Sequence, residues 1–512
     1  MRKPTDVLNS LSDKSKNPMY KYERLYRNLY NPEFYLLAYK NIYTNDGSMT
    51  PGVDGVTTDG MSLERIDKII ASLKDHSYRP NPARRTYIAK KNNPAKKRPL
   101  GIPSGDDKLV QEVVRMILES IYEPTFSNVS HGFRPGKSCH TALVKIQNTF
   151  TGAKWFVEGD IQACFDSFDH HVLIEILRRR IKDEAFIGLM WKFLKAGYME
   201  QWKYHKTYTG TPQGSGISPI LANIYLNELD KYMEEYKQEF SRPARTVNPA
   251  HRNMASRIFR YKAKNDKVWN TLGAEEQKKR ARILRQMRAE QRNLPTHPLR
   301  ETSYKSLQYV RYADDFLVGV VGSREDAERL KQDLAVFLKE KLGLTLSAEK
   351  TKITNTAQCA RFLNYDIYVS RSQDIKRLKN GKRQRVYYGV VRLRMPQEKW
   401  AAKLLELGAI RISKDASGKE RWKAMPRGKL MNRTDIEILS RYNAEVRGLY
   451  NYYSLAGNVS TLNHFSSLMK YSMLKTFGSK YRCQVRKIKE RYVKNGEFTV
   501  PYTTKAGPKE AI

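Results

Sequence analysis

The stretch from Tyr309 to Gly319, YVRYADDFLVG, constrains this chain more than any other. Its two adjacent carboxylates, Asp314 and Asp315, separate two runs of β-branched and aromatic residues, a pattern that predicts strand, tight turn and strand. Neighbouring carboxylates repel each other, so an apolar hairpin that presents two of them is stabilised by a cation. Mg²⁺ binds through one or two carboxylates together with substrate phosphates. An ordinary acidic turn on a surface hairpin is the alternative interpretation, and the rest of the chain must decide.

A second acidic position follows the apolar run Trp155–Gly159. The run predicts a strand that ends at Asp160, and residues 166–170 resemble the first turn of a helix. Alone, Asp160 is an ordinary strand-end or capping residue. Together with the two carboxylates of the hairpin it makes a set of three, which a two-metal nucleotidyl-transfer site needs to hold the attacking and leaving oxygens.

Positive charge dominates the composition and indicates the class of partner. Lys and Arg number 93 against 53 Asp and Glu, for a net charge of +40, which favours nucleic acid. An anionic membrane is the alternative, but the chain has no run of about 18 apolar residues and we expect no membrane contact. The N-terminal residues lack the apolar core of a secretory signal, and the four cysteines lack zinc-site spacing. We therefore expect a reduced, soluble, cytoplasmic protein, in a bacterial cytoplasm or nucleoid.

Two loops and a basic turn have the composition of phosphate-binding segments. Residues 87–103 predict two short strands joined by a turn with five cations, which suits a polyphosphate, although a solvated basic hairpin has the same pattern. Residues 130–138 end in Gly-Lys-Ser but lack the glycine spacing of a Walker loop. The Gly/Pro/Ser-rich residues 209–219 open a helix, whose backbone N–H groups suit a base or phosphate, with a plain loop as the alternative.

Residues 237–300 differ in composition from their surroundings. Across 241–300 there are 16 Lys or Arg and four acids, in helical runs with few apolar residues. A helix that is polar all round is solvated or bound to something charged. We interpret this segment as an insertion that contacts RNA, with a solvated surface excursion as the alternative. Basic residues are also dense at 374–394, and the helices that follow interleave Tyr with cations, which is typical of nucleic-acid contact.

Four sequence blocks, in this order, carry a resemblance to a known family: Arg-Pro-Leu-Gly-Ile-Pro at 98–103, Ser-His-Gly-Phe-Arg-Pro at 130–135, Pro-Gln-Gly with Ser-Pro at 212–219, and Tyr-Ala-Asp-Asp at 312–315. They resemble the successive blocks of a reverse transcriptase. More narrowly, the chain is similar to group II intron-encoded reverse transcriptase/maturases of the mitochondrial-like lineage, from about Tyr22 to Lys480.

The resemblance implies an α+β fold, a right-hand polymerase whose fingers and palm contain an antiparallel palm sheet, followed by an all-helical thumb, the maturase or X domain. The expected divisions are an N-terminal extension and start of the fingers at 1–75, fingers and first part of the palm at 76–236, the basic helical insertion at 237–305, the palm with its YADD hairpin at 306–370, the thumb at 371–475, and a basic, partly ordered remnant of the DNA-binding region at 476–512.

The resemblance also assigns the metal site. Asp160, Asp314 and Asp315 are expected to be catalytic and to hold two Mg²⁺ ions, with Mn²⁺ able to substitute. Ile161 and Ala313 are the neighbours that present backbone groups in those blocks, and Ile161 is expected among the metal ligands.

Further residues match positions that contact nucleotide or nucleic acid in the family. Phe165 matches the residue that stacks under the sugar and excludes a 2′-hydroxyl. Lys90 and Arg98 match the triphosphate-binding cations of the fingers, and Gln213 matches the glutamine that contacts the incoming nucleotide and template. The expected nucleic-acid contacts are Arg134, Lys137, Lys262, Arg280, Arg383, Arg385, Tyr450 and Tyr453.

The function implied is an RNA-directed DNA polymerase that binds its group II intron RNA, assists splicing and supports retrohoming by target-primed reverse transcription. Its expected partners are intron RNA, an RNA template, a DNA primer or target and dNTPs; a homodimer is compatible with the resemblance. A splicing-only maturase, and a reverse transcriptase of a retron or antiviral system, are the alternatives.

The chain departs from the family pattern in three places. Ser215 and Asn364 stand where relatives often have glycine. No cysteine pairs and no His-Asn-His signature follow the thumb, so we expect the C-terminal endonuclease to be missing, either naturally or because the chain is shortened.

Overall fold

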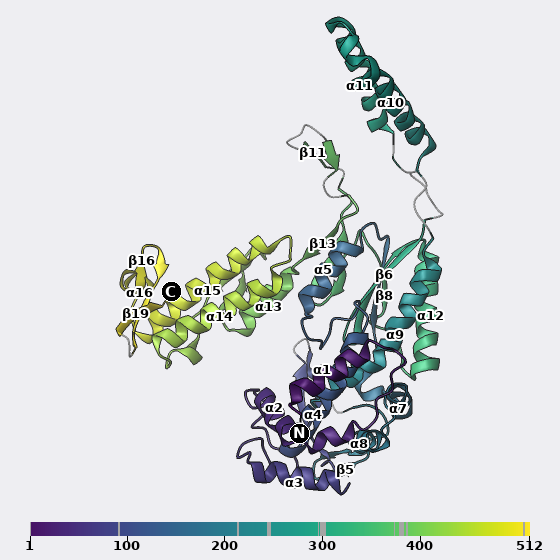
Figure 1. The fold of residues 1–512 in the computed structure, drawn as a ribbon. Helices are drawn as coiled ribbons and strands as arrows, with labels where there is room; N and C mark the ends of the chain where they lie inside the picture. The colour runs from purple at the N-terminus through teal and green to yellow at the C-terminus, as the bar shows by residue number, and fades with distance from the viewer. Residues whose placement is uncertain are drawn as a thin grey trace.

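The computed structural model describes residues 2–90, 93–211, 214–242, 247–294, 296, 304–372, 374–377, 383–385, 388–504 and 507–511. Figure 1 shows three parts: a large body that holds the N-terminus, a helical arm that holds the C-terminus, and a helical hairpin that projects away from both. The expected α+β class is confirmed, with antiparallel sheet in the body and mainly helix in the arm.

The palm sheet lies at the centre of the body. Its strands β6 (Ser306–Tyr312), β7 (Asp315–Val321), β3 (Trp155–Asp160) and β8 (Lys352–Asn355) pair in that order and are all antiparallel. Successive side chains of a strand point to opposite faces. In β7 this alternation sends Val318 into the core beneath α9 (Ser218–Phe240) and α12 (Arg324–Leu342), and Leu317 into a second core that continues into the thumb. The sheet therefore separates two hydrophobic cores.

The fingers form a second four-stranded sheet. Strands β1 (Ala83–Lys90) and β2 (Asn93–Ile102) make the expected basic hairpin, and the sheet continues through β4 (Tyr198–Glu200) to β5 (Lys203–His205) in the order β2-β1-β4-β5. Helix α4 (Gly105–Tyr122) follows the hairpin and is buried along most of its length. The surrounding helices are α1 (Pro4–Ser15), α2 (Pro32–Ile42), α3 (Leu63–Lys74), α5 (Cys139–Thr149), α7 (His170–Arg178) and α8 (Glu184–Lys195).

One N-terminal prediction needs correction. The helical spacing of Tyr and Leu in residues 20–43 predicts two helices divided by Pro32, but between residues 20 and 31 the structure has only a short 3₁₀ turn, η1 (Tyr26–Tyr30). The backbone N–H of Tyr22 donates to the carbonyl of Arg180 at 2.8 Å, and Tyr22 forms a bridge with Ile181. This long-range pairing holds the segment extended although its apolar spacing suits a helix.

The basic insertion is a helical hairpin. Helices α10 (Pro249–Val268) and α11 (Ala274–Asn293) pack against each other and project from the body (Figure 1). Among their described residues the buried one is Asn265, whose side-chain oxygen accepts from Arg280 at 3.1 Å. These two helices thus pack together without an apolar core of their own.

The arm contains the expected thumb helices, α13 (Gln397–Glu406), α14 (Asp435–Tyr453) and α15 (Leu462–Lys480). One hairpin, β14 (Ile410–Lys414) with β15 (Glu420–Ala424), adds a strand pair to this helical region. A small sheet joins the thumb to the palm, with β13 (Val391–Arg394), β10 (Tyr365–Val369) and β9 (Ala360–Phe362) in that order. A further basic pair, β11 (Ile375–Arg377) and β12 (Arg383–Arg385), lies between them in the chain.

The prediction of a partly ordered C-terminal tail is wrong for most of its length. Residues 485–504 and 507–511 form α16 (Val485–Tyr492) and two strand pairs, β16 (Val493–Lys494) with β17 (Glu497–Phe498) and β18 (Val500–Thr504) with β19 (Gly507–Ala511). The rings of Tyr492 and Phe498 lie 5.2 and 5.0 Å from that of Phe477, measured between centroids. The few apolar residues of the tail meet in one cluster on the thumb, which local periodicity does not reveal. Among the described helices none is long and apolar enough to cross a membrane.

Candidate active site

The three predicted carboxylates meet at one edge of the palm sheet. Asp160 is the last residue of β3 and pairs in register with Asp315, the first residue of β7. Asp314 lies in the turn between β6 and β7, next to Ala313, which adopts a left-handed conformation with φ of 57°. Strand pairing therefore brings together acidic residues that are far apart in the sequence.

The loop at 130–138 supports this turn from behind. A Cβ atom on Gly132 would lie 2.3 Å from the backbone nitrogen of Ala313, so the close approach requires glycine. The carbonyl of Gly132 accepts from the side chain of Asn223 at 2.8 Å, which ties the loop to α9. The Ser-His-Gly-Phe block is thus a backbone support for the catalytic turn.

The carboxylates crowd each other. Loss of water around the carboxyl, together with the charges of Asp314 and Asp160, raises the pKa of Asp315 to about 7. Burial is also the main reason why the pKa of Asp314 is raised. Lys350 Nζ lies 2.8 Å from Asp160 Oδ2, and this contact raises the pKa of the lysine. Nearby cations do not fully neutralise the three carboxylates, and Lys350 compensates part of their negative charge.

This chemistry fits divalent metal ions. Three carboxylates supply the hard oxygen ligands that such ions prefer. In the part of the chain that the structure describes, no group of three or more His, Cys, Asp and Glu side chains is already arranged as a metal site, and Lys350 holds one of the oxygens. The side chain of Ile161 is buried and apolar, so only its backbone could contribute a ligand.

A buried ion pair lies beneath the turn and was not predicted from the sequence. Arg311 and Asp230 are fully buried, with Arg311 Nη2 2.6 Å and Nε 2.8 Å from the two carboxylate oxygens. Arg311 also donates to the carbonyl of Ala313 at 2.9 Å, and the hydroxyl of Tyr309 donates to Asp230 at 3.1 Å. The only sequence signal is a cation inside the apolar run of β6, where an unpaired charge would be costly.

Phe165, for which a sugar-facing role is predicted, lies five residues after Asp160 in the chain. Ala163, whose φ of 46° lies in the left-handed region, reverses the backbone after β3. Phe165 is then the second residue of the short helix α6 (Cys164–Ser167). Its ring is half-buried and meets the ring of Phe133 edge-on at 6.4 Å. Its carbonyl accepts from the backbone N–H of Thr211 at 2.7 Å. Phe165 thus joins the loop of the Ser-His-Gly-Phe block to the loop that contains Gln213.

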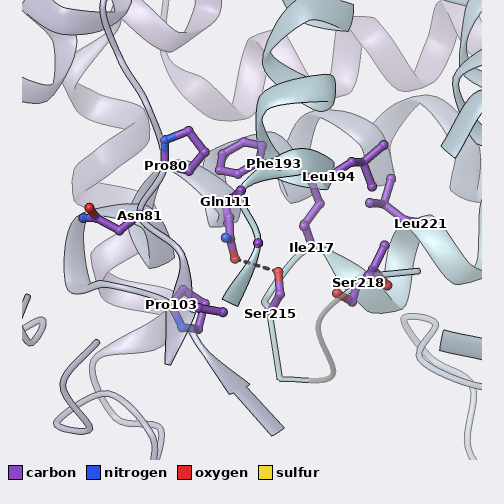
Figure 2. Close-up of a pocket in the computed structure, with 14 residues that line it drawn as sticks. Pro80, Asn81, Pro103, Gln111, Phe193, Leu194, Ser215, Ile217, Ser218 and Leu221 are labelled. Carbon is purple, nitrogen blue, oxygen red and sulfur yellow. Dashed lines mark hydrogen bonds between the residues drawn. The ribbon is translucent and has the colours of Figure 1, made fainter. Parts of the chain in front are cut away.

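Gln213 lies outside the described residues, but the residues after it are anchored. The hydroxyl of Ser215 donates to Gln111 Oε1 on α4 at 2.8 Å, and both side chains are buried (Figure 2). Beside this bond is a cavity of about 30 Å³, lined in part by Thr211, whose buried hydroxyl has no partner among the described residues. A cavity of this size holds one water molecule. The serine at this glycine position therefore fastens the loop to the helix behind it.

The two predicted triphosphate-binding cations are on the β1–β2 hairpin. The side chain of Lys90 lies outside the described part of the structure. Arg98 pairs with Ile88, and its positive charge partly opposes the burial that raises the pKa of Asp314. Arg98 is therefore in a position to attract an anionic ligand of the site.

The predicted nucleic-acid contacts divide into internal and accessible residues. Arg134 is buried, paired with Glu123 at 2.8 Å, and donates to the carbonyls of Ser127 and Ser130. Tyr453 is also buried, and its hydroxyl donates to the carbonyl of Asn364. These two side chains stabilise the protein itself, so we exclude them from the RNA surface. Those that remain at least partly accessible are Lys137, Lys262, Arg280 and Tyr450, while the side chains of Arg383 and Arg385 lie outside the described part.

Comparison with known proteins gives two family matches. Residues 88–247 and 281–367 match the reverse transcriptase (RNA-dependent DNA polymerase) family, and residues 389–506 match the type II intron maturase family. The second match includes α16 and most of the terminal hairpins, which agrees with their packing onto the thumb.

Individual relatives extend over most of the chain. The group II intron-encoded protein LtrA of Lactococcus lactis subsp. cremoris is 47% identical, over 95% of this chain and 80% of its own. An uncharacterized 91 kDa protein in the cob intron of Schizosaccharomyces pombe is 38% identical over 93% of this chain and 57% of its own. The protein YkfC of Escherichia coli is 34% identical over 70% of this chain and 86% of its own.

Proposed function

The chain belongs to the group II intron-encoded reverse transcriptase/maturase family, and on that premise we propose which of its residues carry out RNA-directed DNA synthesis. As a member it is an RNA-directed DNA polymerase with a role in splicing. The observation that supports the assignment most directly is the pairing of Asp160 with Asp315 beside Asp314. The proposed substrates are dNTPs, a primer and an RNA template, and the proposed wider role is retrohoming by target-primed reverse transcription.

The three aspartates are the proposed ligands of two Mg²⁺ ions, with Mn²⁺ as a substitute. Ions held by these carboxylates would lower the pKa of the attacking 3′-hydroxyl and stabilise charge on the leaving group. Lys350 would give up its contact with Asp160 to such ions, and Arg98, together with Lys90, would draw the triphosphate toward the site. Phe165 packs under the sugar of the incoming nucleotide. Phosphoryl transfer requires mostly such positioning and charge neutralisation from the protein.

Primer extension on an RNA template tests this proposal. We expect Mg²⁺-dependent cDNA from the wild-type protein and none from Asp314→Ala/Asp315→Ala, because the variant loses two of three metal ligands. Binding of intron RNA to the variant should remain close to wild type, which shows that the protein is folded. Full-length cDNA from the variant would overturn the assignment of the metal site.

The intron RNA is the proposed partner of the α10–α11 hairpin. This hairpin has a large excess of cations, exposes nearly all its side chains and projects away from the body (Figure 1). A splicing-only maturase is the second candidate, but it has no need of three crowded carboxylates whose repulsion destabilises the fold. The match to an intron maturase favours an intron partner over a retron.

A further inference from the structure

The fingers sheet has a second face, opposite the one that holds Arg98. In the β1–β2 pairing Arg98 lies opposite Ile88, so the alternating partners Tyr87 and Pro99 belong to the other face. The residue two before Tyr87, Arg85, shares that face. We call it the outer face of the fingers.

Planar side chains cross this outer face from strand to strand. The guanidinium of Arg85 lies 4.0 Å from the ring centroid of Tyr198. The ring of Tyr198 in turn stacks on His205 at 4.9 Å with an interplanar angle of 10°. Because β5 is the edge strand of the sheet, this column of stacked groups ends at the margin of the sheet.

Two exposed aromatic residues flank the column. Trp202 is 93% exposed in the β4–β5 turn, and Tyr208 is 79% exposed just after β5. Both turn residues, Gln201 and Trp202, have positive φ values of 48° and 65°. Such a turn favours asparagine and glycine, so a bulky tryptophan there costs stability without any packing in return. An almost fully exposed tryptophan in a strained turn indicates a binding role.

A cleft lies beside these rings, and cations outnumber acids around it. Its lining includes Arg85, Tyr198, Lys206 and Tyr208, with Asp166 as the acid, while Trp202 lies outside it. The cleft extends to Thr211, in the loop bonded to Phe165. Lys203 is exposed on the same hairpin. The nearby Glu200 accepts a hydrogen bond from the hydroxyl of Tyr87 at 2.6 Å, so this carboxylate of the hairpin already has a partner.

We propose that this outer face binds unpaired nucleotides of the intron RNA. Bases stack on Trp202 and Tyr208 and extend the existing column, while Lys203, Lys206 and Arg85 contact the phosphates. Aromatic side chains interleaved with cations are the usual means of holding a single strand. Because this face is opposite the one that holds Arg98, RNA bound to it leaves Arg98 free to contact a triphosphate. This inference rests on the proposed function, since it assigns the site to the same RNA partner.

The test uses the full-length protein with its catalytic site filled by a primer–template duplex. A fluorescent 20-nucleotide oligouridylate then reports binding at a second site. We expect Trp202→Ala and Tyr208→Ala each to weaken this binding by roughly 10-fold, as stacking contributions of single aromatic residues suggest. Trp202→Phe should keep the affinity but lose the quenching of tryptophan fluorescence that accompanies binding.

The matched control is Tyr204→Ala, which alters the same hairpin on its opposite face, since Tyr204 pairs with Met199 rather than with Tyr198. It should leave oligouridylate binding unchanged, as should Asp314→Ala/Asp315→Ala, which removes polymerisation only. If the wild type binds oligouridylate but does not polymerise, the polymerase proposal is contradicted and the proposal for the outer face is not.

Three results would overturn the inference. The first is unchanged oligouridylate binding by both Trp202→Ala and Tyr208→Ala. The second concerns a longer template overhang. If the longer overhang raises primer–template affinity in the wild type but not in Trp202→Ala, the face binds the template. The third is concentration-dependent self-association of the wild type that Trp202→Ala abolishes, which assigns the face to protein.

Discussion

Arg311 and Asp230 connect the catalytic turn to helix α9 through a fully buried ion pair. Removing one partner leaves the other charge buried and uncompensated, whereas removing both does not. We expect Arg311→Met and Asp230→Leu each to lower the free energy of unfolding by about 3–5 kcal/mol, and the double variant to lose less than either. Urea denaturation measures all three. A double variant that loses the sum of the two single effects would show that the ion pair contributes little as a pair.

The bond between Ser215 and Gln111 positions the loop that contains Gln213. We expect Ser215→Gly, which removes the hydroxyl, and Gln111→Met, which removes its acceptor, to raise KM for dNTP several-fold while kcat changes little. The reason is that a loosened loop weakens nucleotide binding more than it alters the reacting groups. Steady-state primer extension with varied dNTP gives both constants.

The two changes should also be non-additive, because each removes the same hydrogen bond. The double variant therefore serves as the control. If its increase in KM equals the product of the two single increases, the two residues do not share a role. Equal losses in kcat for both single variants would instead indicate a general defect in folding.

His131, in the loop that supports the catalytic turn, should make stability depend on pH. Burial and nearby cations lower its pKa to about 4, and its Nδ1 lies 2.8 Å from the hydroxyl of Thr141. An unfolded histidine takes up a proton near pH 6.5, so the unfolded chain binds more protons between about pH 6.5 and 4. Stability contributed by neutral His131 is complete above about pH 6.5 and is lost as the pH falls toward 4.

Replacing this histidine separates its effect from those of the carboxylates. In His131→Gln, the decrease in the free energy of unfolding from about pH 7 to about pH 4.5 should be smaller than in the wild type by roughly 2 kcal/mol. Denaturation curves at the two pH values measure it. An identical decrease in both proteins would mean that the histidine is protonated normally in the folded state.

At the scale of elements, the α10–α11 hairpin should govern the salt dependence of RNA binding. Changing Lys262, Lys264, Arg282 and Arg285 to Gln removes four cations from the projecting hairpin. Every phosphate that is no longer neutralised should reduce the slope of log K against log salt by about 0.7–0.9. Titrations of intron RNA at several salt concentrations give the slope. Glu275→Gln/Glu276→Gln, on the same hairpin, should not reduce it, and an unchanged slope in the quadruple variant would make the hairpin a solvated projection.

Elements were predicted well where the pattern is local and poorly where partners are distant. The β1–β2 hairpin, the β6–β7 hairpin and the strand that ends at Asp160 follow from residue alternation and turn residues. The extended segment at Tyr22 and the folded tail around Tyr492 depend on long-range contacts, and both predictions were wrong for that reason. The divisions between domains remain predictions.

At the scale of the whole molecule, ordered motifs predicted the fold and the meeting of Asp160 with Asp314 and Asp315. The surroundings of the site could not be predicted in the same way. Asp230 lies 81 residues before Arg311, and no local pattern relates them. Likewise, a cation in a loop has the same sequence signature whether it faces solvent, as predicted for Arg134, or is buried against Glu123. Burial is a property of the assembled fold.

The palm sheet bears on how the polymerase and maturase regions are joined. Neighbouring residues of β7, such as Leu317 and Val318, belong to different cores, so this one strand contributes side chains to both. On the side of Leu317 and Phe156, helix α5 packs on β6 and brings the ring of Phe150 to 6.4 Å from that of Phe156, while β9 packs on β3 and β7. The thumb continues this core from its far side, through β13, which pairs with β10 and packs on α5. The border between the two family matches therefore crosses one small sheet, and a polymerase cut there would lose β13 and leave β10 as an unpaired edge.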